Sequence, residues 1–462
     1  MMKPTETATA KNKMASVPIK SLMFSMGLPM ILSMAVQAFY NIVDSYFVSQ
    51  MPDAPGLTGA GEYGLNALAL SFPVQMLMIA IGVGTGVGIN SILSRSLGEG
   101  NRVKASRIAG NAIFLGVCTS AFFIAVGQFA IKAYLATQNA APVSLQMGTE
   151  YLHICMTYSF GAILFMIYEK LLQGAGRTTA STIAQITGAL LNIVLDPIMI
   201  YGLVGVPAMG IQGAAYATVI GQVASLAIGI TFHHRRNKDI DASLRNLKPD
   251  KTIIKEIYAI GIPAILMQAL MAFMNYGVNI MLSRLSDVVV TAYGVYYKIQ
   301  QFVYFAAFGM NNALIPIVAY NYGMKDKKRT NDAIAYGLLY SVAIMTAGAI
   351  ALQAFAHPIV NIFDLSGPTA GYSVLAIRIV TLGYLFAAAN ITFQGVFQAL
   401  GNGVSSLNIS ILRLIVIPLP IVFLFSTHAN AEQNVWWAFP IAEFAALIFA
   451  ALMMKKRIQG TR

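Results

Sequence analysis

Charged side chains are scarce in this sequence. Asp, Glu, Lys and Arg make up 10% of its 462 residues, whereas soluble domains carry about 25%. This shortage excludes an ordinary soluble globular domain. Apolar residues take the place of the charged ones, because 57% of the chain is hydrophobic and the mean hydropathy is +0.67. We therefore expect a polytopic membrane protein whose helices pack against one another and against lipid.

Cysteine and histidine are also few. Cys118 and Cys155 lie in separate apolar segments, and the five histidines show no metal-binding spacing. This excludes a disulfide framework and a zinc motif, and no cofactor is expected. The glycine-rich run 82–88 lacks the lysine of a phosphate-binding loop. Residues 1–20 lack the apolar core of a signal peptide, which indicates a cytoplasmic tail.

Long apolar runs make up most of the chain. A helix that crosses a membrane needs about 20 apolar residues. The sequence predicts twelve such spans, at residues 21–49, 64–93, 106–133, 147–173, 178–202, 210–233, 255–284, 288–320, 331–362, 372–400, 404–427 and 435–454.

The distribution of Lys and Arg orients these spans. With the N-terminus in the cytoplasm, 25 of the 30 basic residues fall in cytoplasmic segments, and only Lys132, Arg284 and Arg378 fall outside. Cytoplasmic loops of membrane proteins carry such an excess. We therefore attribute the net charge of +12 to topology rather than to nucleic-acid binding. Both termini are expected on the cytoplasmic side of the cell (plasma or inner) membrane.

The chain contains an internal repeat. Residues 24–51 align without gaps on residues 258–285, and this alignment pairs Gly27 with Gly261 and Ile31 with Ile265. Further matched pairs follow at an offset of 225, namely Gly84/Gly309, Gly98/Gly323 and Gln75/Gln300. Each copy starts on the same side, since six spans is an even number. Such parallel repeats are related by an axis along the membrane normal.

The repeat sets the predicted domain boundaries. A basic segment, 234–254, separates a first lobe (21–233) from a second lobe (255–454), and residues 455–462 form a cytoplasmic C-terminal tail. Two six-helix lobes that face each other enclose a central cavity. This organisation predicts an alternating-access transporter.

Acidic residues within the spans are rare, and the two clearest are Asp44 and Asp196. Asn192 and Asp196 are four residues apart, so they share one helix face. Pro197 is expected to bend that helix. A buried pair of acids can hold a proton, and a set of carboxylate and amide oxygens also suits Na⁺. The choice between H⁺ and Na⁺ stays open. A purely structural role also stays open, in which the acids only hydrogen-bond to neighbouring helices and hold the lobe together.

Several motifs together resemble the multidrug and toxic compound extrusion (MATE) family. They are GLPMILSMAVQAFYNIVDSYFVS (27–49), SRSLGEGN (94–101) with its repeat AYNYGMKD (319–326), LQGAGRTT (172–179), LNIVLDPIMIYGL (191–203) and GIQGAAYAT (210–218). The resemblance covers residues 19–455. It implies an all-α polytopic fold of twelve transmembrane helices in two pseudo-symmetric six-helix lobes. It also implies export of drug-like, often cationic compounds by antiport against H⁺ or Na⁺.

The resemblance also assigns ion-coupling residues in the first lobe. The acid of the family's first helix falls on Asp44, and the polar residue two turns before it falls on Gln37. The Asn/Asp pair of the fifth helix falls on Asn192 and Asp196, and the threonine of the sixth helix falls on Thr218. The expected coupling ion is H⁺ or Na⁺, with the Na⁺ option at Asp44, Asp196 and Asn192.

The second lobe departs from one branch of the family. The NorM-like branch carries acids in helices 7 and 10, but this chain has Met271 in the first place and no acid within 372–400. At the positions that repeat Asn192 and Asp196, the second lobe has Ile417 and Ile421. The sequence is therefore closer to the DinF-like branch, and ion coupling is expected in the first lobe alone.

Substrate contacts are predicted at Met34, Tyr40, Tyr276, Tyr296 and Glu443, because thioethers, ring faces and a carboxylate suit organic cations. Most aromatic and methionine side chains in the spans are nevertheless expected to be ordinary packing groups. Glu443 has an alternative role, since it can pair with Arg413 or Lys298, which also lie within spans. Glu169 and Lys170 are expected to form a solvated pair near a loop.

Other functions fit the same sequence less well. A flippase for lipid-linked saccharides is expected to carry more cationic residues in its cavity and often extra helices. An intramembrane aspartyl enzyme would use Asp44 and Asp196 as a dyad, but the two-lobe duplication favours transport over catalysis. We therefore expect a transporter and not an enzyme. It should act as a monomer, with drug-like small molecules and the lipid bilayer as its partners and no nucleic acid.

Overall fold

The computed structural model describes residues 12–459 apart from 54–57, 242, 364 and 366. Within these residues all regular elements are helical, which confirms the all-α fold class. The outer parts of the predicted tails, 1–11 and 460–462, lie outside the described residues.

The first lobe is built from α2 to α9, preceded by a short helix α1 at Lys13–Ser16. Its helices are α2 (Ile19–Ser49), α3 (Ala60–Gly98), α4 (Arg102–Phe129), α5 (Ile131–Ala136), α6 (Pro142–Thr157), α7 (Phe160–Gly174), α8 (Thr178–Tyr201) and α9 (Ile211–Arg236). A short 3₁₀ turn, η1 (Leu244–Leu247), lies between the lobes.

The second lobe is built from α10 to α19. Its elements are α10 (Lys251–Leu282), α11 (Asp287–Gly323), α12 (Lys327–Ala354), α13 (Ala356–Ile362), α14 (Gly367–Val380), η2 (Thr381–Gly383), α15 (Tyr384–Ala399), α16 (Gly403–Ile411), η3 (Leu412–Val416), α17 (Pro418–Ser426), α18 (Ala431–Asn434), η4 (Val435–Trp437) and α19 (Ala438–Gln459).

The helices agree with the twelve predicted spans. Eleven helical stretches of the described chain are long and apolar enough to cross a membrane, and α6 with α7 makes a twelfth if the pair is one span. These two helices meet at an angle of 47°. The break was not predicted, because the apolar pattern runs through it without interruption.

The two lobes touch through glycines that the repeat relates to each other. Gly98 lies against the backbone of Tyr320, and Gly323 lies against the backbone of Arg95. The offset of 225 pairs Gly98 with Gly323 and also Arg95 with Tyr320. The two contacts are therefore equivalent, and the repeat exchanges one for the other. A side chain at either glycine would collide with the opposite lobe.

A second pair of contacts obeys the same symmetry nearer the middle of the spans. Gly84 lies against Ile265, and Gly309 lies against Ile31. Ile31 and Ile265 are themselves a matched pair of the repeat. These contacts are those expected from a pseudo-two-fold axis between the lobes. They run along the second half of α3 and α11 and the first half of α2 and α10, toward what we call the closed end, which carries Gly98 and Gly323.

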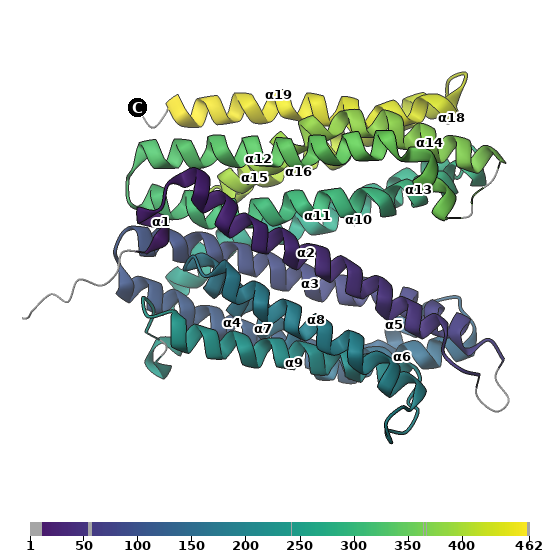
Figure 1. The fold of residues 1–462 in the computed structure, drawn as a ribbon, viewed down its shortest axis with the longest axis horizontal. Helices are drawn as coiled ribbons and strands as arrows, with labels where there is room; N and C mark the ends of the chain where they lie inside the picture. Colours follow the sequence, from purple (N-terminus) through teal and green to yellow (C-terminus); the bar gives the residue numbers. More distant parts are fainter. Residues whose placement is uncertain (1–11, 54–57, 242, 364, 366, 460–462) are drawn as a thin grey trace, which may run out of the picture.

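Apolar side chains are exposed along both halves of α2 and α10, including the end opposite the glycine contacts. Phe39 and Tyr46 in the second half of α2 are 58% and 61% exposed, and Phe273 and Tyr276 in the second half of α10 are 65% and 67% exposed. The two lobes are close together at the closed end and further apart at the other (Figure 1). We call the half without these glycine contacts the divergent half.

Helix α1 bridges the lobes at the closed end. The Arg329 Nη2 of α12 donates hydrogen bonds to the backbone oxygens of Met14 (2.9 Å) and Val17 (2.8 Å). On the other side, Asn12 Nδ2 donates to Ala175 O of the first lobe at 3.1 Å. Met14 is fully buried. The described part of the predicted tail is therefore packed against both lobes, and α2 begins at Ile19, earlier than the predicted span.

Candidate functional site

Three of the predicted ion-coupling residues meet between α8 and α9. Asn192 Nδ2 donates hydrogen bonds to Asp196 Oδ1 (3.1 Å) and to Thr218 Oγ1 (3.4 Å). Asp196 is fully buried. The adjacent Pro197 does not end α8, which continues as one helix to Tyr201. The amide of Asn192 thus links the carboxylate to the neighbouring helix.

Asp44 joins this group from α2. Its carboxyl group lies within hydrogen-bonding reach of the Asp196 carboxyl group, and Tyr40, one turn earlier on α2, lies close to both acids. Helices α2, α8 and α9 lie next to one another in the first lobe (Figure 1). We call Asp44, Asn192, Asp196 and Thr218 the acid cluster. It lies in the divergent half, since Asp44 belongs to the second half of α2.

The acid cluster has more acceptors than donors. Asp44 Oδ1, Asn192 Oδ1 and Asp196 Oδ2 are buried, and no described residue donates a hydrogen bond to them. All three are oxygens that can only accept unless a carboxyl group is protonated. Two carboxyl groups in contact also repel each other when both are charged. A proton or a small hard cation such as Na⁺ fits this group of oxygens. It would pair with the unpaired acceptors and would also reduce the repulsion between the two carboxyl groups.

Gln37 belongs to a separate hydrogen-bond chain. Its Oε1 accepts a hydrogen bond from Gln185 Nε2 at 3.0 Å, and the Gln185 Oε1 in turn accepts one from Ser33. This chain also joins α2 to α8, but it lies about two turns from Asp44 along α2. Gln185 was not singled out from the sequence, since a single glutamine in an apolar run gives no distinctive pattern.

Sequence reasoning also missed polar residues beside Asp44. Gln75 Nε2 of α3 donates a hydrogen bond to the Tyr151 hydroxyl of α6 at 3.3 Å. Cys155, one turn after Tyr151, lies within reach of Tyr151 and Gln75 and near Asp44. Tyr151 and Cys155 are buried. Their spacing of four residues places both on one helix face, but the sequence alone does not indicate that this face meets Gln75.

A largely buried ion pair lies in the second lobe. Arg413 Nε lies 2.5 Å from Glu443 Oε1, with the two side chains 6% and 13% exposed. Asn390 Nδ2 of α15 donates to Glu443 Oε2 at 2.8 Å, and the Arg413 guanidinium lies 5.8 Å from the Tyr304 ring centre. Of the two predicted partners of Glu443, the structure thus selects Arg413. Lys298 is exposed on α11.

The predicted substrate residues differ in accessibility. Tyr276 is 67% exposed in the divergent half, and Met34 and Tyr40 of α2 are half-buried. Tyr296 is 1% exposed. Its hydroxyl donates a hydrogen bond to Gln300 Oε1 at 2.7 Å and lies 3.4 Å from the Tyr384 hydroxyl. Tyr296 therefore presents no surface to a ligand in this conformation.

The expectation that Glu169 and Lys170 form a solvated pair was wrong for the lysine. Lys170 is 4% exposed, and its Nζ donates a hydrogen bond to Gln173 Oε1 at 2.9 Å. Gln173 Nε2 donates in turn to Glu169 Oε1 at 2.7 Å. Gly86 of α3 leaves room for the Lys170 stem, which packs against it. Burial of the stem explains why a position near a loop did not make the residue solvated.

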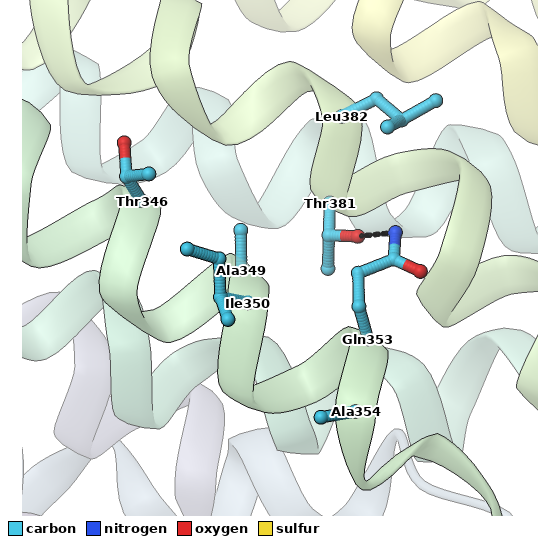
Figure 2. Close-up of a pocket in the computed structure, with 7 residues that line it drawn as sticks. All are labelled: Thr346, Ala349, Ile350, Gln353, Ala354, Thr381 and Leu382. Carbon is cyan, nitrogen blue, oxygen red and sulfur yellow. Dashed lines mark hydrogen bonds between the residues drawn. The ribbon is translucent and has the colours of Figure 1, made fainter.

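A groove of about 500 Å³ lies on the flank of the second lobe. No residue of the acid cluster or of the Arg413–Glu443 ion pair lines it. Figure 2 shows α12 side chains opposite Thr381 and Leu382 of η2, with Gln353 hydrogen-bonded to Thr381 at 2.8 Å. Gln353 Nε2 also donates to Arg378 O at 2.7 Å. The other lining side chains, Thr346 apart, are apolar, so this groove is no ion site.

Comparison with known proteins identifies the family. The MatE family model matches residues 29–198 and 263–424, more than two thirds of the chain and parts of both lobes. The multidrug export protein MepA of Staphylococcus aureus (strain bovine RF122 / ET3-1) is 26% identical over 437 residues, which are 95% of this chain and 94% of MepA. MepA of Staphylococcus saprophyticus is 25% identical over 432 residues, or 94% of this chain and 92% of that protein.

Solved structures share the fold over almost the whole chain. One is described as the outward-facing conformation of a multidrug resistance MATE family transporter, with a TM-score of 0.89, 25% identity and coverage of 98% of this chain and 99% of that one. A transporter of the MOP superfamily from Pyrococcus furiosus has a TM-score of 0.88, also at 25% identity, with 98% of each chain covered. With the motifs, both lobes and the family model in agreement, this chain belongs to the MATE family of membrane transporters, and it is not an enzyme.

Proposed function

We propose that this protein exports drug-like, often cationic compounds by antiport against H⁺ or Na⁺. The ion binds the acid cluster of the first lobe, and the two lobes alternate between two orientations about their shared axis. The relatives named as multidrug export proteins support the substrate class. The absence of acids at the corresponding second-lobe positions supports placement in the DinF-like branch.

The observation that carries the proposal is the excess of acceptors in the acid cluster. Three buried oxygens from Asp44, Asn192 and Asp196 have no donor among the described residues. Leaving buried polar atoms unpaired is costly, and a charged one more so. A bound proton or Na⁺ removes this cost, so occupancy of the cluster and the conformation of α2, α8 and α9 are expected to depend on each other.

The position of the cluster supports a transport cycle. Asp44 lies in the second half of α2, whereas Ile31 in the first half contacts Gly309 of the second lobe, and the lobes are further apart toward the end of α2 that carries Asp44 (Figure 1). The excess of basic residues assigns the closed end to the cytoplasm, so the divergent half faces outside. An ion that enters from outside therefore reaches the acid cluster before it reaches the closed end. Its binding favours the inward-facing state, drug then replaces the ion, and the lobes return outward.

The substrate path is proposed to run between the lobes in the divergent half. Tyr276 is exposed there, and Tyr40 lies beside the acids. A ring face next to a carboxylate attracts an organic cation by two independent interactions. This arrangement lets drug and ion compete for the same region, which is what antiport requires. The protein is proposed to work as a monomer in the cell membrane, with both termini in the cytoplasm.

The test is ethidium accumulation in cells that express the wild type, Asp44→Asn or Asp196→Asn. Each asparagine keeps the side-chain shape but removes the charge that binds the ion. We expect both variants to lose export, so ethidium rises to the level of cells without the transporter. Asp287→Asn, at an exposed acid at the start of α11, serves as the control and should export normally. Normal export by both cluster variants would refute the proposal.

A further inference from the structure

The buried ion pair of the second lobe occupies a position related to the acid cluster. The repeat offset of 225 pairs Glu443 of α19 with Thr218 of α9, and Thr218 accepts a hydrogen bond within the cluster. Each lobe therefore holds an acidic site at or beside the corresponding helix. Asp44 of α2 and Asp196 of α8 lie in the cluster with Thr218 of α9, and Glu443 lies on α19 itself.

The two sites differ in whether the chain itself supplies a cation. No ion pair of the described residues involves Asp44 or Asp196, whereas Arg413 lies 2.5 Å from Glu443. Asn390 adds a hydrogen bond to the second carboxylate oxygen of Glu443. The Glu443 carboxylate is therefore compensated by a fixed guanidinium and a fixed amide.

The local backbone explains why only the second lobe has room for this cation. The position that repeats Arg413 in the first lobe is Gly188, and α8 and α9 touch there, with Gly188 against Gly221 and Ser225. No longer side chain fits at that contact. In the second lobe the helix opens into a π-helical turn at Leu412–Val416, and Arg413 extends from it toward Glu443. Such turns are often found at functional sites.

We propose that Arg413 is the resident counter-cation of Glu443 and takes the place that the mobile H⁺ or Na⁺ takes in the first lobe. Arg413 is then a specificity-determining residue, because it restricts ion coupling to one lobe. This inference rests on the proposed antiport function. Its consequence is that removing the Arg413 charge converts Glu443 into a second ion site, since a buried carboxylate without a partner must bind a cation or a proton.

Among the described residues, the ion pair of Glu443 is with Arg413. The groups that face its carboxylate are Arg413 from η3 and Asn390 from α15, with Tyr304 of α11 behind the guanidinium and Tyr384 of α15 against the Tyr304 ring. Helices α16 and α17, which also pack in this region, contribute no titratable side chain.

The experiment measures drug transport in proteoliposomes as a function of H⁺ and, separately, of Na⁺ concentration. The variants are Arg413→Gln and the neutral pair Arg413→Gln with Glu443→Gln. With one ion site the wild type should show a Hill slope of about one, which Arg413→Gln should raise toward about two for the same ion. The neutral pair should return the slope to that of the wild type. Equal slopes for both variants would overturn the inference.

The neutral pair keeps the test decisive if Arg413→Gln alone does not fold. Replacing both partners of a buried ion pair is tolerated far better than removing one. A neutral pair that loses its dependence on the ion would show that Glu443 is itself a coupling group, against the inference. The two proposals fail separately: a wild type without any ion dependence refutes antiport, whereas an ion-dependent wild type with an unchanged Arg413→Gln refutes only the role of Arg413.

Discussion

At the scale of single residues, the acid cluster combines strong acceptors with one shared donor. The Asn192 amide reaches both Asp196 and Thr218, at 3.1 Å and 3.4 Å. It therefore fixes the Asp196 carboxyl group relative to α9, and the remaining oxygens stay available to the ion. This makes Asn192 the residue whose loss should change ion affinity without changing the charge of the site.

We predict that Asn192→Ala changes the affinity for the coupling ion about tenfold or more, because a hydrogen bond to a charged group is worth about 1.5–3 kcal/mol. The lost bond stabilises the charged Asp196 carboxylate, so H⁺ should bind more tightly, whereas Na⁺ should bind more weakly because the Asn192 Oδ1 is lost as a ligand. The measurement is the ion concentration that gives half-maximal drug transport. Gln37→Ala is the matched control, since Gln37 is bonded to Gln185 and not to the acids. The assignment fails if Gln37→Ala has the larger effect.

Single residues were predictable from sequence only where an unusual residue stood in an apolar run. Asp44, Asn192 and Asp196 met that condition, and the structure brings them together. Gln185, Tyr151 and Gln75 did not stand out, because neutral polar side chains are common in spans and only their partners on other helices give them a role. The burial of Tyr296 likewise depends on contacts with α15 that no local pattern shows.

At the scale of helices, the closed end depends on two glycines that allow backbones to touch. Gly98 and Gly323 each lie against the opposite lobe. Small residues permit such close approach between membrane helices.

Gly323→Ala is predicted to shift the population away from the closed state about tenfold or more, because overpacking costs about 1–3 kcal/mol. Gly294→Ala in the same helix is the control, since a Cβ there meets nothing within 4 Å. Spin labels on exposed Val103 and Met324, in a chain with Cys118 and Cys155 replaced by serine, report the separation of the lobes. Identical distance distributions for the two variants would contradict this role of Gly323.

The bridge through α1 gives a second prediction at this scale. Arg329 donates to two backbone oxygens of the α1 segment, and Asn12 holds that segment to the first lobe. Arg329→Gln should loosen the closed end and make the peptide bonds near Met14 accessible to protease added at that side. Lys328→Gln, at the exposed neighbouring residue, should leave the protection intact. Equal cleavage of both variants would show that the bridge does not hold the lobes.

Helices as elements were predicted well, and their interruptions were not. Apolar length determines where a span exists, so all twelve predicted spans have a counterpart. The bend between α6 and α7, the 3₁₀ turn Thr381–Gly383 and the π-helical turn Leu412–Val416 have no apolar signature. Each depends on packing between helices, which determines where the backbone departs from regular α-helix.

At the scale of the whole molecule, the repeat predicted how the lobes face each other. The matched pairs Gly84/Gly309 and Ile31/Ile265 were found as sequence identities, and in the structure each glycine lies against the isoleucine of the other lobe. The repeat could not predict which half of the molecule is closed. Both arrangements bury the same sequence pattern, and the choice between them rests on small differences in free energy between two states.

The asymmetry of charge between the lobes is the central feature of the proposed cycle. One lobe leaves two acids for a mobile ion, and the other lobe neutralises its acid with Arg413. In the proposed cycle, a pseudo-symmetric backbone therefore carries the ion site in one lobe, so that the ion gradient acts on that lobe.

The most direct test is transport of ethidium by the purified protein in proteoliposomes, driven by an imposed H⁺ gradient or by an imposed Na⁺ gradient. If the proposed cycle is correct, one of the two ion gradients drives ethidium in the wild type, in the direction opposite to the flow of the ion. The double variant Asp44→Asn with Asp196→Asn should abolish this transport. Ethidium transport of equal rate in the wild type and in this double variant, under either gradient, would contradict the proposed cycle.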